Sequence, residues 1–523
     1  MHIAIRTAAR RVLDRPDAEL FTLLVGGHAL AWSLYAALSK GNLDNYGDMA
    51  ESFAWGQEWQ LGYHKHPPVF AWIAALWFRF FPTEDAAFYV LAMVNVAVGL
   101  VAVRQLAGYF LEGRSRIAAA LTLVFCPFYT FYAFRYNANT ILLSLWPLAA
   151  LFFYRSFRDR GVLDSLCAGL FAALAVLAKY SSGLLLLTLF AAALLHPERR
   201  SYFRSAAPYV AAAVLLAAVA PHLRWLFDVG FLPFAYAGER VGLSEAETVA
   251  RVLHFAFDQL LNLAPLLAVM AWMLGRSGGA LRRFWDTHEN PGRALPLLLC
   301  FGPFVLTALV SLALRVDAAS VWGIPMWFAL PLAMLTTPGL RFGEIEFRRG
   351  FRLIAALLVG VPLAAPLVYA AYWTAGVKYV MEPRRELAEE LSRMFSEQTG
   401  EPLRVVAGTP AIAASMAFYA PEHPSWFIGF DLRQAPWITS ERLEREGLAI
   451  VCEAADRPCV DIAQASARQG GVRSEVVLQR HSILGTGRPF TYVVTIVPPG
   501  VSDEKWRTGF FLPDEPGIEP RPL

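Results

Sequence analysis

Residues 42–68 read NLDNYGDMAESFAWGQEWQLGYHKHPP, a polar stretch that follows one long apolar segment and precedes many more. Its carboxylates come first, at Asp44, Asp48 and Glu51, and basic side chains follow at positions 64–66. Charged groups beside a bilayer are costly and usually have a function there. The stretch therefore predicts a functional loop at the surface of a membrane that the rest of the chain crosses repeatedly.

The composition also indicates a membrane protein. Of the 523 residues, 56% are hydrophobic and only 17% are charged, whereas soluble domains carry about 25% charged residues. Residues 2–17 are polar and rich in arginine, and the apolar run after them is long enough to remain as a spanning helix. We therefore expect no cleavable signal peptide.

About eleven apolar runs approach the length of roughly 20 residues that a helix needs to cross the hydrocarbon core. They cover residues 19–39, 86–107, 117–134, 139–154, 162–178, 181–196, 206–221, 254–275, 294–314, 320–337 and 351–373. Arginines cluster in alternate connections, around residues 6–15, 114–116, 155–160, 199–204, 276–293 and 341–349. The positive-inside rule places these clusters in the cytoplasm, and eleven spans then place the C-terminal part outside.

The C-terminal part has a different sequence pattern. From about residue 377, runs such as LRVVAG, GLAIVCE, SEVVLQ and TYVVTIV alternate with helical stretches at 386–396 and 440–446. We predict a small α/β extracytoplasmic domain that covers the active site or helps to recognise the acceptor. The predicted architecture is a polytopic α-helical membrane domain over residues 1–373, whose outer loop 40–85 contains interfacial helices, followed by this domain over residues 374–523.

The five cysteines fall into two groups. Cys126, Cys167 and Cys300 lie in apolar runs and are expected to be small buried hydrophobic residues. Cys452 and Cys459 lie seven residues apart in the polar C-terminal part, where a local disulfide is more plausible than a zinc site. A bridge there would agree with an oxidising compartment.

The segment 66–81, HPPVFAWIAALWFRFF, is short and dense in aromatic residues. Two prolines suit the first turn of a helix, and tryptophans suit the level of the lipid headgroups. We expect a helix that lies in the outer interface. The alternative is a short tilted span.

The acidic side chains of the loop suggest a catalytic base. If residues 44–51 are helical, Asp44, Asp48 and Glu51 share one face, because they are three or four residues apart. Crowded carboxylates raise one another's pKa, which suits proton abstraction from an acceptor. The alternative is a set of solvated acids near a helix N-terminus.

The basic side chains suggest a site for a lipid phosphate. His64, Lys65 and His66 precede two prolines, where cations oppose the helix dipole unless an anion joins them. Lysine reaching toward headgroups is the alternative. Isolated cations also occur in the other outward connections, where topology does not explain them. With their polar neighbours, these are Arg135, Tyr136, Asn137, Lys179, Tyr180, His222, Arg224 and Arg240.

These motifs resemble those of the GT-C glycosyltransferases of the protein mannosyltransferase type, in particular the bacterial branch that includes lipid A aminoarabinose transferases. In that family an Asp, usually followed by Glu, precedes a Gly-Tyr-x-x-His-Pro-Pro run. Here Asp48 precedes the run Gly62-Tyr63-His64-Lys65-His66-Pro67-Pro68 by 14 residues. Met49 stands in place of the second acid, and Glu51 or Asp44 would compensate for it.

Weaker resemblances cover the rest of residues 20–340. The Arg135-Tyr136-Asn137 and Lys179-Tyr180 pairs resemble family motifs, and the stretch from Pro221 to Trp225, with Arg240, resembles the loop that contacts the donor phosphate. The sequence Trp322-Gly323-Ile324-Pro325 resembles a late Trp-x-x-Pro motif. The resemblance implies a GT-C fold with about 11–13 transmembrane helices.

The resemblance also implies a reaction. A sugar would pass from a polyprenyl phosphate to a lipid or lipopolysaccharide-type acceptor, with inversion, at the periplasmic face of a bacterial inner membrane. Asp48, with Glu51, would act on the acceptor. The cations expected to bind the donor phosphate are Lys65, His66, Arg135, Lys179 and Arg240. The residues expected to bind substrate are Asp44, Tyr63, His64, Tyr136, Asn137, Tyr180, His222, Arg224 and Trp322.

Protein cations can neutralise a lipid monophosphate, so we expect no essential metal or other cofactor, although a divalent metal is the open alternative. We expect membrane lipids but no nucleic acid among the partners. The main alternative function is a transporter or flippase of lipid-linked sugars, which would place polar groups at mid-membrane and show internal repeats. A non-catalytic membrane receptor is a second alternative.

Overall fold

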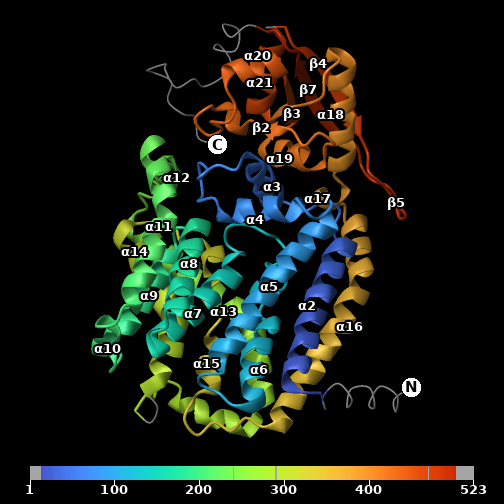
Figure 1. Ribbon diagram of the computed structural model, residues 1–523. Coiled ribbons are helices and arrows are strands. Elements are labelled where there is room, and N and C mark those ends of the chain that lie inside the picture. The colour runs from blue at the N-terminus through green and yellow to red at the C-terminus, as the bar shows by residue number, and fades with distance from the viewer. Residues whose placement is uncertain (1–12, 14, 239–240, 289–290, 469, 502–523) are drawn as a thin grey trace. The chain divides into compact units, whose positions relative to one another are not determined.

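The computed structural model describes residues 13, 15–238, 241–288, 291–468 and 470–501 (Figure 1). Its contacts divide the chain into two compact units. The first comprises Met1–Ala36, Tyr89–Arg224 and Phe234–Ala364, and the second comprises Ala37–Phe88, Trp225–Pro233 and Ala365–Leu523. The polar first loop is thus grouped with the C-terminal part, whereas the sequence boundary at residue 373 assigned it to the membrane domain.

Within the described ranges, six helices are long and apolar enough to cross a membrane. They are α2 (Asp17–Ser39), α5 (Asp85–Ala107), α11 (Ala207–Asp228), α13 (Glu245–Leu274), α14 (Ala294–Leu314) and α16 (Glu344–Thr374). Shorter helices join them in the first unit: α6 (Gly113–Leu121), α7 (Leu142–Asp159), α8 (Val162–Ala178), α9 (Ser182–Leu195), α10 (Arg199–Phe203) and α15 (Leu330–Leu335), together with α12 (Leu232–Gly238), which starts in the second unit. Figure 1 shows α2 beside α16, where Leu358 packs over Gly27.

Two predicted spans are wrong because they are not continuous helices. Residues 117–134 form the end of α6 and two 3-10 turns, η1 (Thr122–Phe125) and η2 (Pro127–Tyr129). Pro127 lacks an amide hydrogen and holds Cys126 in an extended conformation, which ends the helix. Residues 320–337 likewise form η5 (Ser320–Gly323), turns and α15, because Pro325 and Pro331 interrupt the run.

A third boundary also differs from the expectation. The sequence placed the end of a span at residue 221, and α11 continues to Asp228 with Pro221 inside it. Prolines are tolerated inside membrane helices when neighbouring groups satisfy the freed carbonyl. His222 and Arg224 therefore lie on a helix and not in a loop.

Polar side chains tie α5 to α7 within the first unit. The Asn95 amide donates to the carbonyl of Thr140 at 2.7 Å and accepts from the Ser144 hydroxyl at 2.5 Å. Interhelical hydrogen bonds of this kind add to van der Waals packing between membrane helices. The pair of helices therefore provides a fixed support for the turn at residues 135–140.

The second unit contains the first loop, with α3 (Asp48–Glu58) and α4 (Val69–Phe78). The predicted helix at 66–81 is present as α4, and its 10 residues rise about 15 Å, too short to span a bilayer. Phe53 of α3 and Phe78 of α4 both contact Phe418, at 5.1 and 5.7 Å between ring centroids. These rings give the loop a hydrophobic core that it shares with the C-terminal part.

The predicted C-terminal α/β domain is present (Figure 1). Its five-stranded sheet has the order β2-β1-β3-β7-β4; β1 is parallel to β2 and β3, and β7 is antiparallel to β3 and β4. The strands are β1 (Val405–Gly408), β2 (Ser425–Trp426), β3 (Leu448–Glu453), β4 (Val472–Leu478) and β7 (Phe490–Val497), and a separate pair is formed by β5 (His481–Ser482) and β6 (Gly485–Thr486). The helices are α17 (Lys378–Met381), α18 (Arg384–Thr399), α19 (Pro410–Tyr419), α20 (Ser440–Glu446) and α21 (Arg457–Arg468), and the remaining 3-10 turns of the chain are η3 (Gly275–Arg283), η4 (Pro291–Arg293) and η6 (Ile428–Phe430).

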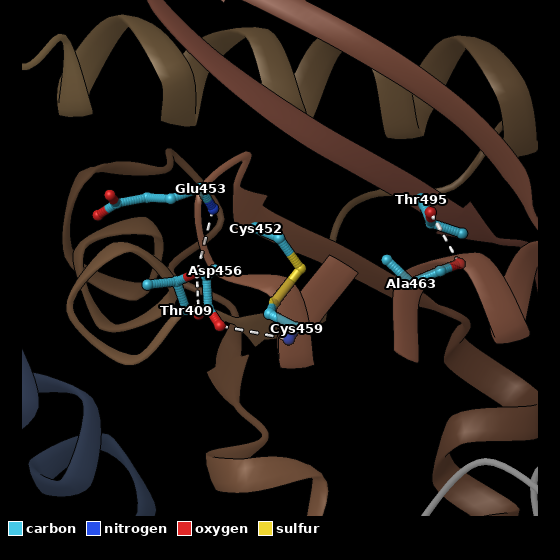
Figure 2. Close-up of a disulfide and its surroundings, with 7 residues drawn as sticks. All are labelled: Thr409, Cys452, Glu453, Asp456, Cys459, Ala463 and Thr495. Atoms are coloured by element: carbon cyan, nitrogen blue, oxygen red, sulfur yellow. Dashed lines mark hydrogen bonds between the residues drawn. A yellow bond between two sulfur atoms is a disulfide. The ribbon is translucent and has the colours of Figure 1, made fainter. Parts of the chain in front are cut away.

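Cys452 and Cys459, the pair for which a disulfide was predicted, are joined by one (Figure 2). The bridge connects β3 to the first turn of α21. Beside it, the Thr409 hydroxyl donates to the Asp456 carboxylate at 2.7 Å and accepts from the backbone N–H of Glu453 at 3.1 Å. The bonds fasten the turn that separates the strand from the helix.

Candidate active site

The first turn of α3 is built by Asp44, which precedes the helix. Its Oδ1 accepts the backbone N–H groups of Tyr46, Gly47 and Asp48, at 2.6–3.2 Å, and its Oδ2 accepts that of Met49 at 2.8 Å. Gly47 has φ +86°, a left-handed conformation that favours glycine. The expectation that Asp44 shares a helix face with Asp48 is wrong, because the helix begins at Asp48 and Asp44 supplies the missing acceptors at its N-terminus.

Residues 42–44 are anchored to the start of the C-terminal part. The Asn42 amide donates to the carbonyls of Tyr379 and Glu382 at 2.5 and 3.0 Å. The guanidinium of Arg384, only 4% exposed, donates to the carbonyl of Asp44 at 3.1 Å and forms an ion pair with Glu382 at 2.7 Å. The position of the acidic turn thus depends on residues about 340 positions away.

Asp48 and Glu51 occupy the first turn of α3, and Glu51 binds Lys65. The Glu51 carboxylate lies 3.1 Å from the Lys65 ammonium, and the two side chains are 15% and 30% exposed. Burial raises the pKa of Glu51, Lys65 opposes the rise, and Asp48 adds to it. Crowding of the carboxylates therefore contributes to the raised pKa as expected, but burial is the larger cause.

The turn at residues 63–66 is closed around Trp55. The N–H of Tyr63 donates to the carbonyl of His66 at 2.9 Å, and the Tyr63 hydroxyl donates to the carbonyl of Trp55 at 2.6 Å. The two rings stack at 4.8 Å, and His64 and His66 contact the same indole. Burial and the neighbouring Lys65 hold the pKa of His64 well below its usual range. His64, which the sequence grouped with the cations, is therefore neutral at pH 7.

Gly62 allows Trp225 to approach this turn. A Cβ at Gly62 would lie 2.3 Å from the Trp225 ring, so any side chain there would displace the indole. Trp225 belongs to the stretch that was predicted to contact the donor phosphate, and it lies in the same unit as the first loop. Close packing against Trp225 therefore explains why position 62 is a glycine.

In the first unit, the turn after η2 contains Arg135, Tyr136 and Asn137. The Asn137 side chain accepts the N–H groups of Asn139 and Thr140 at 2.8 and 3.1 Å. The Thr140 hydroxyl donates to the carbonyl of Arg135 at 3.0 Å. Tyr136 is fully buried and Arg135 is half-buried. Asn137 therefore shapes the turn that leads to α7.

Lys179 and Tyr180 follow the end of α8, and each contacts another polar side chain of the first unit. The Lys179 ammonium donates to the side-chain oxygen of Asn139. The Tyr180 hydroxyl and the His222 Nε2 lie 3.0 Å apart, and His222 is buried. The structure thus brings Tyr180, after α8, together with His222 of α11, and it adds Asn139, before α7, which the sequence analysis missed.

An apolar cavity of about 700 Å³ adjoins these residues. Tyr180 and Trp322 line it together with aliphatic side chains of α9 and α14, such as Leu184, Leu187 and Val310. The segment that carries Trp322 is held by Gln259 of α13, whose amide donates to the Ser320 carbonyl at 3.0 Å and accepts from the Trp327 indole at 3.1 Å. Gln259 is a second residue that the sequence analysis missed, because an isolated glutamine in an apolar run has no motif.

Two further predicted residues are Arg224 and Arg240. Arg224 lies on α11 and is exposed. Arg240 falls outside the residues that the structure describes. Among the described residues, no group of three or more His, Cys, Asp or Glu side chains is arranged to hold a metal ion. The predicted residues thus form two groups, one in the loop of the second unit and one at helix ends of the first.

A family model and a curated relative that match this chain are both named as glycosyltransferases. Residues 65–225 match the family model described as dolichyl-phosphate-mannose-protein mannosyltransferase. The lipopolysaccharide core galacturonosyltransferase RgtB of Rhizobium johnstonii is 26% identical over 388 residues, which are 71% of this chain and 75% of the relative. These matches confirm the resemblance that the sequence motifs indicated.

Solved structures agree on the fold. ArnT from Cupriavidus metallidurans bound to undecaprenyl phosphate aligns with a TM-score of 0.58 at 13% identity, over 92% of this chain and 98% of that chain. Its apo form aligns with a TM-score of 0.57 at 13% identity, over 91% of this chain and 97% of that chain. The polytopic helical fold class predicted from the sequence is confirmed.

Proposed function

We propose that this chain, a membrane glycosyltransferase of the GT-C type, transfers a hexosyl or pentosyl group from a polyprenyl-phosphate donor to a lipid or lipopolysaccharide-type acceptor. The match of residues 65–225 to the dolichyl-phosphate-mannose-protein mannosyltransferase family model supports the proposal. The observation that carries the proposal is the first turn of α3, where Asp48 lies beside the partly buried Glu51–Lys65 pair. The names of the relatives support the substrate classes, since one acts on the lipopolysaccharide core and another was solved with undecaprenyl phosphate.

Asp48 is the proposed base. Its carboxylate removes the proton from an acceptor hydroxyl, and the oxygen attacks the anomeric carbon on the face opposite the phosphate. The bond between that carbon and the phosphate oxygen breaks, and polyprenyl phosphate leaves with the electron pair. The product therefore has the inverted configuration. The carboxylate of Glu51 is paired with Lys65 at 3.1 Å, so Glu51 is the weaker candidate for this step.

Cations would stabilise the departing phosphate. Lys65 and His66 of the second unit and Arg135 and Lys179 of the first are the candidates, with Arg240 added from the sequence alone. A protein ammonium or guanidinium can neutralise a lipid monophosphate without a metal, so we propose that no metal is essential. We also propose that the loop faces the periplasm, on the basis of the arginine distribution.

The apolar cavity beside Tyr180 supports a lipid carrier. Its lining is mostly apolar, which suits part of a hydrocarbon chain better than a sugar, and its volume is about 700 Å³. Tyr180, His222 and Trp322 lie at or beside this lining, where they would contact the head of the lipid. Their proposed role is therefore donor binding and not proton transfer.

The experiment is an assay of the purified protein with a panel of polyprenyl-phosphate sugars and lipid acceptors. Asp48→Asn should lower the turnover number by about 10²–10⁴-fold, the usual contribution of a general base. Release of free polyprenyl phosphate by the wild type is the required signal. Near-normal turnover by Asp48→Asn would overturn the assignment of the base.

Asp44→Asn is the matched control, because it changes another acid of the same turn. Asp44 caps α3, so this variant should lose thermal stability together with activity. Asp48→Asn should lose activity while its melting temperature stays within a few degrees of the wild type. Equal destabilisation by both variants would mean that Asp48 has a structural role.

A further inference from the structure

A second cavity lies in the first unit at the arginine-rich ends of its helices. Its volume is about 240 Å³, and its wall comes from α7, α9, the start of α14 and the segment before it. Most of the lining is apolar, with Phe153, Phe157 and Leu298 among its residues. Three side chains with polar atoms also line it: Tyr154, His196 and Thr287. The cavity is therefore hydrophobic with a few hydrogen-bonding groups in its wall.

The wall of this cavity is held in place by buried contacts. Arg293 is fully buried, and its guanidinium donates to the backbone carbonyls of Phe284, Asp286 and Ala333. These bonds fix the segment that supplies Thr287 and Gly292 to the wall. On the other side, the rings of Phe157 and His196 contact each other at 4.6 Å.

Basic residues are frequent in the two stretches that adjoin the cavity wall in sequence. The stretches 155–160 and 198–204 together contain six arginines and two acids. The N–H of Arg199 donates to the carbonyl of His196, a residue of the cavity wall, at 3.1 Å, so α10 starts three residues after the wall. Arg160 is neutralised by Glu198 at 3.0 Å, whereas Arg199 and Arg200 are exposed to solvent. The positive charge beside the cavity therefore exceeds the negative charge.

This cavity is distinct from the predicted donor-binding residues of the first unit. The Lys179–Asn139 contact lies near the start of α7, and the cavity lies near its end. The 18 residues of α7 rise about 27 Å, close to the thickness of the hydrocarbon core. The two sites consequently belong to opposite ends of the same helix.

We propose that this cavity binds one anionic phospholipid, with an acyl chain among Phe153, Phe157 and Leu298. The phosphate accepts hydrogen bonds from the Tyr154 and Thr287 hydroxyls and pairs with Arg199 and Arg200. Basic pockets between membrane helices favour anionic headgroups over zwitterionic ones by charge. The binding site lies at the membrane face that the arginines mark, and it does not depend on the proposed sugar transfer.

Native mass spectrometry of the full chain in detergent tests the proposal, with phosphatidylglycerol and phosphatidylcholine of matched acyl chains. The wild type should retain one phosphatidylglycerol about tenfold more tightly than phosphatidylcholine. The double variant Arg199→Gln/Arg200→Gln should lose this preference. Ala294→Trp, which places an indole in the cavity at an exposed position of its wall, should weaken the binding of both lipids.

The double variant Arg341→Gln/Arg352→Gln is the matched control, because it removes two exposed arginines from segments that supply no residue to the cavity wall, whereas Arg199 and Arg200 directly follow the wall residues His196 and Pro197. It should leave the preference for phosphatidylglycerol unchanged. The proposal is overturned if this control removes the preference as fully as Arg199→Gln/Arg200→Gln, since the charge would then act non-specifically. It is equally overturned if Ala294→Trp binds both lipids as the wild type does while its melting temperature is unchanged.

Discussion

The first loop and the helix ends around Lys179 hold their polar side chains in different ways. In the loop, Asp44 and Asn42 depend on Arg384, Glu382 and Tyr379, about 340 residues away. At the helix ends, the partners are 40 or 42 residues apart, as in the Lys179–Asn139 and Tyr180–His222 contacts. The loop therefore requires a folded C-terminal part, whereas the helix ends require only the helices of the first unit.

The C-terminal part therefore has a structural role, which is to support the first loop. Its helices α18 and α19 contact the loop through Arg384 and Phe418, and the loop carries the proposed base. A variant that damages this support should therefore abolish activity without touching a reacting group. Variants at the helix ends should have smaller and more local effects.

The largest effect is expected for Arg384→Met. The change removes the closer of the two cations that pair with the fully buried Glu382, leaving Lys378 at 3.7 Å, and it removes the bond to the carbonyl of Asp44. Breaking a buried pair from one side costs about 3–5 kcal/mol. We expect a fall of several degrees in the melting temperature of the purified protein, together with loss of transfer.

Arg393→Met is the matched control on the same helix. Arg393 pairs with Glu390 and Glu397 at the surface, with 54% of its side chain exposed. Exposed pairs contribute about 0–1 kcal/mol, so stability and activity should remain near those of the wild type. If both variants behave alike, the anchoring of the loop by Arg384 is wrong.

The second prediction concerns pH. Burial raises the pKa of Glu51 above its ordinary value of 4.5, and Asp48 adds to the rise while Lys65 opposes it. Between the ordinary pKa of 4.5 in the unfolded chain and the raised pKa in the folded protein, Glu51 keeps its proton only in the folded protein. Stability should therefore fall as pH rises through this range, and Glu51→Gln should remove this part of the dependence.

Melting temperatures measured from pH 4 upward, for the wild type and Glu51→Gln, test this sign. Glu397→Gln serves as the control, because that carboxylate is at the surface, with 62% of its side chain exposed. The difference between the wild type and Glu51→Gln should be larger than the difference produced by the control. The raised pKa of Glu51 would be contradicted if the melting temperature of the wild type rose relative to that of Glu51→Gln as the pH increased above 4.5.

Patterns that extend over many residues predicted much of the fold. The apolar runs located most of the helices, and the alternation of apolar residues located the strands and helix 440–446 of the C-terminal part. The runs at 117–134 and 320–337 were misjudged, because hydropathy does not register how a proline breaks hydrogen bonding inside an apolar segment. The composition of an apolar segment indicates that the segment is buried, but it does not show whether the segment forms a continuous helix.

The sequence named the residues of the candidate site but not the contacts that they make. The spacing from Asp48 to the Gly62 run identified the loop, and the isolated cations identified Lys179. The capping role of Asp44 was missed, because a helix N-terminus cannot be placed to one residue from spacing alone. The neutral state of His64 was missed because it follows from burial.

The smallest effect is expected for Tyr180→Phe. The change keeps the ring in the wall of the apolar cavity and removes the hydrogen bond between the hydroxyl and His222. One such bond contributes about 1 kcal/mol, so the melting temperature should fall by only a few degrees, and the apparent affinity for the donor should weaken less than tenfold. Tyr209→Phe is the control, since its hydroxyl bonds the Phe203 carbonyl at an exposed position. Loss of transfer in Tyr180→Phe as complete as in Asp48→Asn would show that Tyr180 acts on the reacting groups and that the helix ends do more than bind the donor.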